Sequence, residues 1–389
     1  MDRTIDMMES NTFSAVNTNC TKLKLVVSHD QRLICGIFYL AITVAGILGN
    51  GIVIFAVFAS KKLQTFTNMF VVNLSVADLL SCLMMQLQCV MMLSPDGVEY
   101  PLSKDFCAFV AGALCVACGC SLYTLASIGF YRYVLLTDKS RTRADTLQTK
   151  LVAVPWIGLT WIVPMVVNLV THAFAREQFG YNEKYHVCGA QDETGMNHEI
   201  EIAQVFGLYS VAFIIVVISY LKIYVYIHKH TLNTLRELDN ESQFSPTRWR
   251  TLSIKSWTST TNRKRTASTM SNSSQTENAR QLYRRQITIT KNMFYVVLAF
   301  TICITPYSVC LIFPQLNGLL YSGVLLMFNS CINPMLYGLK HPHFRQVFKC
   351  LLTCQWSRVP KPSNAFKKIR TLCKFRKDDM QKYEERIML

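Results

Sequence analysis

Seven long apolar runs alternate with shorter polar segments along this chain. They cover residues 33–59, 67–93, 104–137, 149–172, 198–229, 283–312 and 317–339. Each run holds a core of roughly 20 apolar residues, which is the length an α-helix needs to cross a bilayer. A soluble protein could bury one or two such helices, but seven would leave too little polar surface to cover them. The pattern therefore predicts an all-α membrane protein, a seven-transmembrane helix bundle.

Composition and charge support a multi-pass membrane protein. Only 16% of the 389 residues are charged, against about 25% in soluble domains. Charged residues gather between the apolar runs, and the loop after the third run is basic whereas the loop before the seventh has no base. By the positive-inside rule, the N-terminus is extracellular. The net charge of +16 then lies mostly on the cytoplasmic side beside the membrane, which argues against nucleic acid as a partner.

The segments around the runs define the expected domains. Residues 1–32 form an extracellular N-terminus, which is polar, so we expect the first run to act as a signal anchor. Residues 33–353 form the bundle with an eighth helix, and residues 354–389 form a cytoplasmic tail. Within the bundle, residues 230–282 are rich in Ser, Thr, Asn and Arg, which predicts a disordered third cytoplasmic loop. The basic, mostly polar tail is predicted to be disordered as well.

An amphipathic segment follows the seventh run. One helical face of residues 341–352 carries Phe344, Val347, Phe348, Leu351 and Leu352, and bases lie opposite. This pattern predicts an eighth helix lying at the membrane interface.

Short motifs suggest three covalent modifications. Asn19-Cys20-Thr21 is a glycosylation sequon on the outer segment. Cys350 and Cys354 lie where palmitoylation would strengthen the anchoring of the eighth helix. Ser268 ends a basic sequence that resembles a kinase site, and a solvated basic loop is an equal alternative.

Cysteine usage does not predict a disulfide scaffold. Most of the 15 cysteines lie within the apolar runs. Cys107 and Cys188 would face the oxidising outer side, where a bridge can form and persist. Cys20 lies on the same side and is either free or paired with an unidentified partner.

Asp78 is the one carboxylate well inside an apolar run. A central Asp costs about 2.5–3.5 kcal/mol on the membrane-insertion scale, so it should face the bundle interior. Polar residues at matching depth in other runs are its candidate partners: Asn50, Ser121, Asn329, Ser330 and Asn333. Such a group could hold a sodium ion with oxygen ligands, or it could be a hydrated hydrogen-bond network that fixes helix packing.

Two further residues inside the runs invite a functional or a structural interpretation. Arg132 stands at the inner end of the third run, where it could snorkel to the headgroups or form a switchable contact. Pro306 lies in the middle of the sixth run and should kink that helix, passively or as a lever.

Taken together, these positions resemble the rhodopsin-like family of G-protein-coupled receptors. The resemblance covers about residues 33–353 and rests on a series in chain order: Gly49-Asn50, Leu74-Ser75-Val76-Ala77-Asp78, Cys107, Arg132, Trp156, Tyr220, Phe300, Pro306 and Asn333-Pro334-x-x-Tyr337. It implies a receptor that transmits an extracellular signal to a heterotrimeric G protein, with arrestin and receptor kinases as further partners.

The resemblance also implies roles for residues. Cys107 and Cys188 match the disulfide between the second outer loop and the third span. Asp78, Ser121, Asn329 and Asn333 match the sodium pocket, in which Asp78 binds the ion. The residues matching the activation switch are Tyr131, Arg132, Tyr133, Tyr220, Pro306 and Tyr337.

The chain departs from the family pattern at several positions. Tyr131 stands where the family has an acid or amide before the arginine. This departure removes one restraint on the inactive state, so we expect high basal signalling. Ile304 replaces the aromatic residue two positions before the proline of the sixth span, and Ala212 replaces the proline of the fifth. Trp161 competes with Trp156 for the tryptophan position of the fourth span.

The ligand is open between two classes. Leu114 occupies the position of the aspartate of amine receptors, and Met327 that of the retinal-binding lysine, which argues against both ligands. The expected pocket is mostly apolar and favours a lipid-like or uncharged small molecule; it comprises Ala111, Leu114, Cys115, Cys118, Tyr307, Ser308 and Met327. The outer segments hold thirteen acids against seven bases, a field that favours a cationic peptide.

Other functional classes are less consistent with the sequence. No metal-spaced cluster or catalytic triad occurs, so we expect no enzyme and no cofactor beyond an allosteric sodium ion. A transporter would usually show repeats or several intramembrane charges. A non-signalling scaffold or heteromer partner is the main alternative, because of the departures at Tyr131 and Ile304.

Overall fold

A computed structural model provides the three-dimensional structure of the chain. It describes residues 27–95, 103–138, 142–174, 179–182, 185–190, 196–243, 287–288, 290–291, 294–313 and 316–372. The sequence predictions at Asn19, Cys20 and Ser268 therefore lie outside the described residues.

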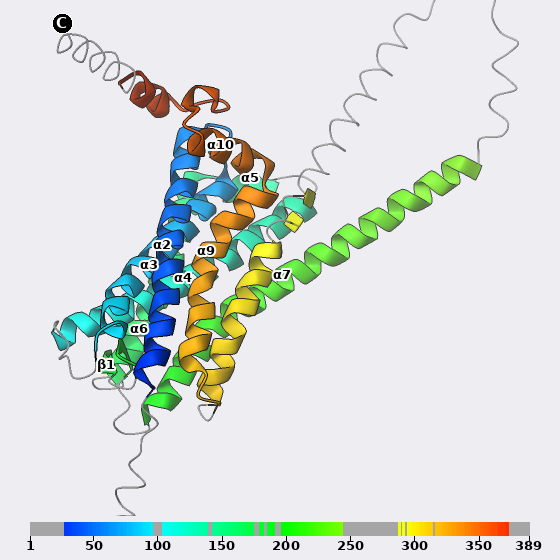
Figure 1. The fold of residues 1–389 in the computed structure, drawn as a ribbon. Coiled ribbons are helices and arrows are strands. Elements are labelled where there is room, and N and C mark those ends of the chain that lie inside the picture. Colours follow the sequence, from blue (N-terminus) through cyan, green and yellow to red (C-terminus); the bar gives the residue numbers. More distant parts are fainter. Residues whose placement is uncertain are drawn as a thin grey trace, which may run out of the picture.

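The structure is a bundle of seven membrane-length helices, as the apolar runs predict (Figure 1). The spans lie within α2 (His29–Ala59), α3 (Phe66–Met92), α4 (Lys104–Thr137), α6 (Lys150–Phe174), α7 (Met196–Gln243), the sixth span Phe294–Ile312 and α9 (Leu319–Lys340). Large apolar side chains such as Leu48, Val90 and Leu169 are exposed on its outer surface. This surface suits hydrocarbon, so the chain is a multi-pass membrane protein.

Side-chain caps mark where three spans begin. Ser28 accepts a hydrogen bond from the amide of Gln31 and forms a capping box with it. Thr65 and Ser103 cap α3 and α4 in the same way. These hydroxyls satisfy amides that have no partner inside the helix, so the local sequence defines the helix starts.

The first span, α2, packs against both α3 and α9. A close approach at Gly49 shows how tightly α2 and α9 fit. A Cβ at Gly49 would lie 3.0 Å from the ring of Pro334. The glycine therefore brings the first span against the proline turn of the seventh.

Two connections differ from the sequence predictions. The helix α7 runs on to Gln243 and extends past the bundle in Figure 1. The prediction of disorder from residue 230 is therefore wrong for residues 230–243, because a helix that starts in the membrane continues without a breaker. A short helix, α5 (Thr142–Leu147), also follows α4.

The segment after α6 forms an antiparallel hairpin that the hydrophobic pattern did not predict. Strand β1 (Phe179–Asn182) pairs with β2 (Val187–Ala190), and Tyr181 lies opposite Cys188. The hairpin packs on α4 at the end of the bundle opposite to α10 (Figure 1).

The eighth helix is confirmed as α10 (Pro342–Leu352), with Phe344 and Val347 buried. Leu352, in contrast, is 67% exposed and does not join the buried face. The ring of Phe344 stacks on Tyr337 at 5.5 Å between centroids, which joins α10 to α9.

The tail beyond α10 is folded through Leu372, so the prediction of a disordered tail is wrong for these residues. A 3-10 turn, η2 (Trp356–Arg358), is followed by a bridge to the end of α2 and a helix over 364–372. Phe366 is fully buried. The apolar residues of the tail reach a partner, α2, that lies some 300 residues earlier in sequence, which local composition does not reveal.

Candidate functional site

The carboxylate of Asp78 is the centre of a polar cluster in the middle of the bundle. Asp78 is 1% exposed. Ser121 of α4 donates to Oδ1 at 3.1 Å, and Ser330 of α9 donates to the same oxygen at 3.4 Å. Asn333 of α9 donates to Oδ2 at 2.8 Å. The carboxylate thus joins three helices, as expected of an acid that must avoid lipid.

The first span joins this cluster through an amide. Asn50 donates to the backbone carbonyl of Ser330 at 2.8 Å and to that of Gly46 at 2.9 Å. Asn50 therefore holds α2 against the part of α9 that bonds to Asp78.

A small cavity of about 10 Å³ adjoins Asp78, enough for one water molecule or one small ion. Its lining combines polar and apolar residues of five helices: Asp78, Ser81, Cys118, Ser121, Tyr209, Phe300, Ile304, Leu326, Met327, Asn329 and Ser330. Cys118 and Met327, which the sequence assigned to the ligand pocket, lie on this cavity. The floor of the expected ligand pocket and the wall of the Asp78 cavity thus share residues.

The oxygen atoms around the cavity suit a hard cation. The Oδ1 atoms of Asn329 and Asn333 are buried, and no group in the described part of the chain donates to them. Two orphaned acceptors and two hydroxyls beside one carboxylate form an oxygen-rich ligand set of the kind that hard cations prefer. Asn329 lines the cavity without bonding directly to Asp78. Three of the four predicted sodium-pocket residues, Asp78, Ser121 and Asn329, line the cavity. The fourth, Asn333, does not line it but donates a hydrogen bond to Asp78. The chemistry of these residues therefore fits a sodium ion.

A second polar network, centred on Asn73, was not identified from the sequence. Its amide nitrogen donates to Thr124 at 2.7 Å and to Thr160 at 3.1 Å, and its oxygen accepts from the indole of Trp161 at 2.9 Å. The network joins α3, α4 and α6 at the depth of the cluster. The sequence feature that could have revealed this network is an Asn inside the apolar run, five residues before Asp78.

Both tryptophans of α6 have polar partners. Trp161 bonds to Asn73, and Trp156 donates to Ser127 of α4 at 3.0 Å. Both tie α6 to the bundle interior, so each makes a structural contact.

At the C-terminal end of α4, which the charge pattern predicts to be cytoplasmic and which is called the inner end below, Tyr131 and Arg132 are both buried. The ring of Tyr131 lies 4.6 Å from that of Phe66, in an aromatic cluster with Phe70 and Trp156. Tyr131 thus packs toward α3 instead of providing a carboxylate beside Arg132. The ammonium of Lys222 lies over the ring of Tyr133, 5.3 Å from the ring centroid.

Two tyrosines of other helices are buried at the same end of the bundle. Tyr220 of α7 lies on Gly129, where a Cβ would come within 3.1 Å of its ring, and it contacts Phe294 of the sixth span. Tyr337 of α9 stacks on Phe344. Neither hydroxyl has a hydrogen-bond partner among the residues described. A buried unpaired hydroxyl costs roughly 1–3 kcal/mol, so this arrangement leaves polar groups that another conformation could satisfy.

His341 links α9 to α10 at this end. It is buried, and its Nδ1 has no partner within the described residues. Burial lowers the pKa of His341 to about 4, with His343 and Arg132 contributing in the same direction. The imidazole is therefore neutral at physiological pH.

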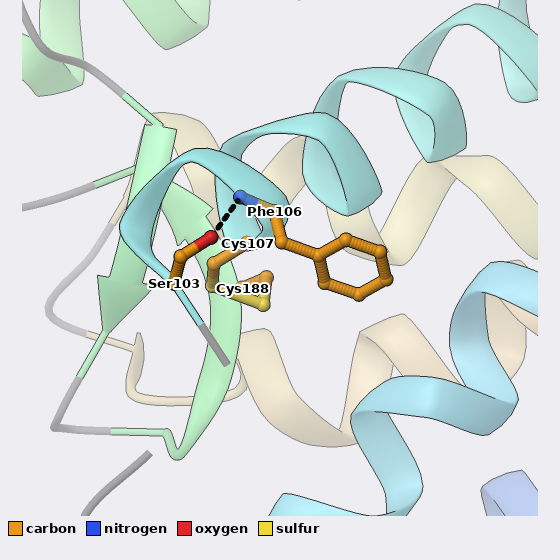
Figure 2. Close-up of a disulfide and its surroundings, with 4 residues drawn as sticks. All are labelled: Ser103, Phe106, Cys107 and Cys188. Carbon is orange, nitrogen blue, oxygen red and sulfur yellow. Dashed lines mark hydrogen bonds between the residues drawn. A yellow bond between two sulfur atoms is a disulfide. The ribbon is translucent and has the colours of Figure 1, made fainter. Parts of the chain in front are cut away.

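At the opposite end of the bundle, Cys107 and Cys188 form a disulfide, with their Cα atoms 5.2 Å apart (Figure 2). The pairing that the family resemblance implied is confirmed. The bond lies at the start of α4, where Ser103 accepts a hydrogen bond from the amide of Phe106. Cross-linking residues 81 apart in sequence stabilises the fold by about 4 kcal/mol in the chain-entropy model.

The remaining pocket residues lie on α4 and on the sixth span. Ala111 packs with Cys107 and Cys188, and Leu114 packs against an apolar cluster that includes Met85 and Met327. Tyr307 and Ser308 of the sixth span are half-buried, as is Cys115. Ala111 thus lies beside the disulfide, and Leu114 lies in the same apolar cluster as Met327, which lines the Asp78 cavity.

The sixth span is helical through Pro306. Ile304 lines the Asp78 cavity, at the position where an aromatic residue was expected from the family pattern. Of the two palmitoylation candidates, Cys354 is exposed, whereas the thiol of Cys350 donates to the carbonyl of Arg358 at 3.5 Å.

Comparison with known proteins gives a consistent family. The family model "7 transmembrane receptor (rhodopsin family)" matches residues 49–337. The chain is 28% identical to the alpha-1D adrenergic receptor of Mus musculus over 88% of its own length and 61% of that receptor. It is 23% identical to the allatostatin-A receptor of Bombyx mori, over 82% of its own length and 79% of that protein.

The chain spans about 60% of the length of the adrenergic receptors it matches. Its structure resembles that of squid rhodopsin with a TM-score of 0.62 at 19% identity, covering 84% of this chain and 88% of that one. At this identity the likeness shows the shared seven-helix fold.

Proposed function

Since the chain belongs to the rhodopsin family of seven-transmembrane receptors, we propose that it transmits an extracellular ligand signal to a heterotrimeric G protein. The observation that carries the proposal is the continuity of the interior. Cys118 and Met327 lie in both the expected ligand pocket and the Asp78 cavity, and Asn333 bonds to Asp78 one helical turn from Tyr337. A ligand that moves Cys118 or Met327 therefore changes the packing around Asp78.

The mechanism follows from differential binding to two conformations. A ligand that binds the open-inside state more tightly shifts the population toward it, and the G protein reads that state. The nucleotide exchange itself is chemistry of the G protein, so the receptor acts without catalytic residues. The extracellular N-terminus required by this direction of signalling is supported by the basic loop after α4 and the basic tail.

Arg132 is the residue that we assign to the G-protein contact. It is buried at the inner end of α4, and outward movement of the sixth span would uncover it. Tyr220 and Tyr337 would turn inward in that state, where their unpaired hydroxyls could gain hydrogen-bond partners directly or through water. Pro306 would be the lever in the sixth span, and Tyr133 would complete the contact surface.

We assign Asp78, Ser121, Asn329 and Asn333 to an allosteric sodium site. The ion would supply positive charge to a carboxylate that has no cationic side chain on its cavity lining. It would favour the compact arrangement in which α3, α4 and α9 meet at Asp78.

Tyr131 is the basis for a proposed high basal activity. Its ring packs on Phe66, and it provides no carboxylate at the position before Arg132. Exchange on an added G protein, measured without ligand, should fall severalfold in Tyr131→Asp. Tyr131→Phe keeps the packing and is the control, for which no change is expected. Unaltered basal exchange in Tyr131→Asp would refute this origin.

The ligand class remains a choice of two. The relatives named above are an adrenergic receptor and an allatostatin-A receptor, so they do not point to one ligand. Leu114 packs in an apolar cluster, which supports an uncharged or lipid-like small molecule and argues against an amine. The acidic outer segments support a cationic peptide. Arrestin, receptor kinases and palmitoylation at Cys354 or Cys350 follow from the family resemblance.

A panel of G-protein dissociation sensors, first without ligand, tests the proposed function. We expect basal dissociation of at least one G-protein class, and its loss in Arg132→Ala. An Arg132→Ala variant that expresses at the cell surface but alters no sensor would favour the alternative of a non-signalling scaffold.

A further inference from the structure

The folded tail forms a surface that the proposed receptor function does not use. The backbone amide of Lys61 donates to the carbonyl of Lys361 at 2.9 Å, and that of Ser363 donates to the carbonyl of Ala59 at 2.9 Å. The hydroxyl of Ser60 donates to the carbonyl of Pro360 at 2.6 Å. The first inner loop and the tail are therefore joined as a short antiparallel bridge.

An aromatic cluster completes this contact. The ring of Phe366 lies 5.9 Å from that of Phe55 on α2 and 6.0 Å from that of Trp356. Phe366 is fully buried, and Val359 is nearly so. The thiol of Cys350 bonds to the carbonyl of Arg358, which connects the same segment to α10. We refer to residues 60–62, α10 and residues 355–372 as the tail module.

The tail module carries a concentrated positive charge. Its bases are Lys61, Lys62, Arg345, Lys349, Arg358, Lys361, Lys367, Lys368 and Arg370, of which all but the half-exposed Arg370 are exposed. No Asp or Glu occurs in residues 59–66 or 341–372. Among the described residues, none of these nine bases forms an ion pair.

These bases repel one another, and the fold brings some of them closer together than they are along the sequence. Lys61 and Lys361 are hydrogen-bonded neighbours across the bridge, and like charges on paired strands are destabilising. Lys367 and Lys368 follow directly on the buried Phe366. A ligand with several negative charges would relieve this repulsion only in the folded arrangement, so it would stabilise that arrangement.

The position of the tail module indicates which ligand could supply this negative charge. It lies against the end of α2. Leu352 and Leu372 of the module and Phe58 near the end of α2 are exposed apolar side chains. Exposed bases next to exposed apolar side chains at the end of a span are typical of binding at the membrane interface. We propose that the tail module binds the headgroups of anionic phospholipids in the adjacent leaflet, and that these lipids hold it folded on the bundle.

Hydrogen–deuterium exchange of the full chain in nanodiscs tests the proposal. Peptides covering residues 59–66 and 355–372 are compared in phosphatidylcholine and in a 70:30 mixture with phosphatidylserine. Both leaflets of a nanodisc have the same composition, so the result does not depend on orientation. Exchange is expected to be about tenfold slower in the anionic discs. Equal exchange in both lipids would overturn the proposal.

Two charge variants separate the module from general basicity. Lys361→Gln, Lys367→Gln and Lys368→Gln together should abolish most of the lipid effect, because each base near an anionic surface contributes about fivefold to binding. The matched control neutralises Lys374, Arg376 and Lys377, which lie outside the described residues. An equal loss in both triple variants would contradict a site built by the folded module.

A third variant tests whether the fold itself makes the site. Phe366→Ala keeps every charge but removes the buried ring. Native mass spectrometry in detergent should count fewer retained phosphatidylserine molecules on Phe366→Ala than on the parent chain. Unchanged retention would show that linear charge suffices and would overturn the proposal. Slower exchange with inositol hexakisphosphate in phosphatidylcholine discs, without any phosphatidylserine effect, would replace the lipid by a soluble polyphosphate and would also overturn it.

Discussion

The middle of the bundle and its inner end differ in how well their most prominent buried polar groups are hydrogen-bonded. In the middle, both oxygens of Asp78 accept hydrogen bonds, from Ser121 and Ser330 on one side and Asn333 on the other. At the inner end, the hydroxyls of Tyr220 and Tyr337 are buried, and the described residues give them no partner. The carboxylate at the centre is thus held in its present arrangement, and the unpaired Oδ1 atoms of Asn329 and Asn333 beside it are available to an ion or a water molecule. The two tyrosines at the inner end instead carry a cost that movement can remove.

This difference suggests separate roles for the two regions. A satisfied polar cluster in low dielectric is strongly held and fixes the relative positions of the helices it joins. Unpaired groups persist where the surrounding structure keeps them, and they favour any alternative that satisfies them. The centre would therefore act as a pivot and the inner end as the part that opens.

The largest effect is expected at the inner end, from Arg132→Ala. Removing the guanidinium should lower nucleotide exchange on a purified G protein about a hundredfold, because we assign the direct contact to this residue. Thermal stability should change little in comparison. A variant that still activates exchange within threefold of the parent would show that the inner end does not act through Arg132.

At the centre, Asp78→Asn should abolish the stabilising effect of sodium. At ten times its Kd, sodium should stabilise the parent by about 1.4 kcal/mol, measured as a shift in Tm against potassium chloride of equal ionic strength. The Asn side chain can keep its bonds if Asn333 rotates to present its orphaned Oδ1. Stability without sodium should therefore change by less than about 1 kcal/mol. A sodium response that survives in Asp78→Asn would place the ion elsewhere.

The two tyrosines give a sharper test, because stability and activity should move in opposite directions. Tyr220→Phe or Tyr337→Phe removes an unpaired hydroxyl, so each should raise stability by about 1 kcal/mol and lower basal exchange. The control is Tyr39→Phe, since the hydroxyl of Tyr39 donates to the carbonyl of Leu320 at 3.4 Å. That variant should lose stability slightly. Destabilisation by both inner-end variants would mean that their hydroxyls are already satisfied.

The smallest effect is a pH dependence at the junction of α9 and α10. Because the pKa of His341 is lowered to about 4 in the folded chain, the unfolded chain binds a proton first as pH falls below about 6.5. Stability should therefore fall between pH 6.5 and 4, by about 1 kcal/mol at pH 5.5. His341→Gln should remove that part of the slope in thermal unfolding. An identical slope in both chains would assign it to other groups.

Much of the fold and of the central site could be predicted from the sequence, because the free-energy cost of placing a polar group in hydrocarbon is large and acts on each residue separately. The high cost of a carboxylate in hydrocarbon predicted that Asp78 would meet Ser121, Ser330 and Asn333, and the structure brings them together. The spans were predicted to within a few residues at most of their ends, since twenty apolar residues have few alternatives in a membrane protein. The roles of Arg132 and of the sodium pocket stay predictions.

What the sequence by itself determined about this protein is the set of membrane spans, the family, the disulfide partners and the depth of Asp78, all of which depend on solvation costs or on motifs in chain order. Tertiary structure alone decided that Cys118 and Met327 reach the Asp78 cavity, that Tyr131 packs on Phe66, and that the tail folds against α2. The physical reason is that each of these contacts joins distant segments through shape and ring packing. Such contacts are many, individually weak and short in range, so they exist only once the helices are assembled.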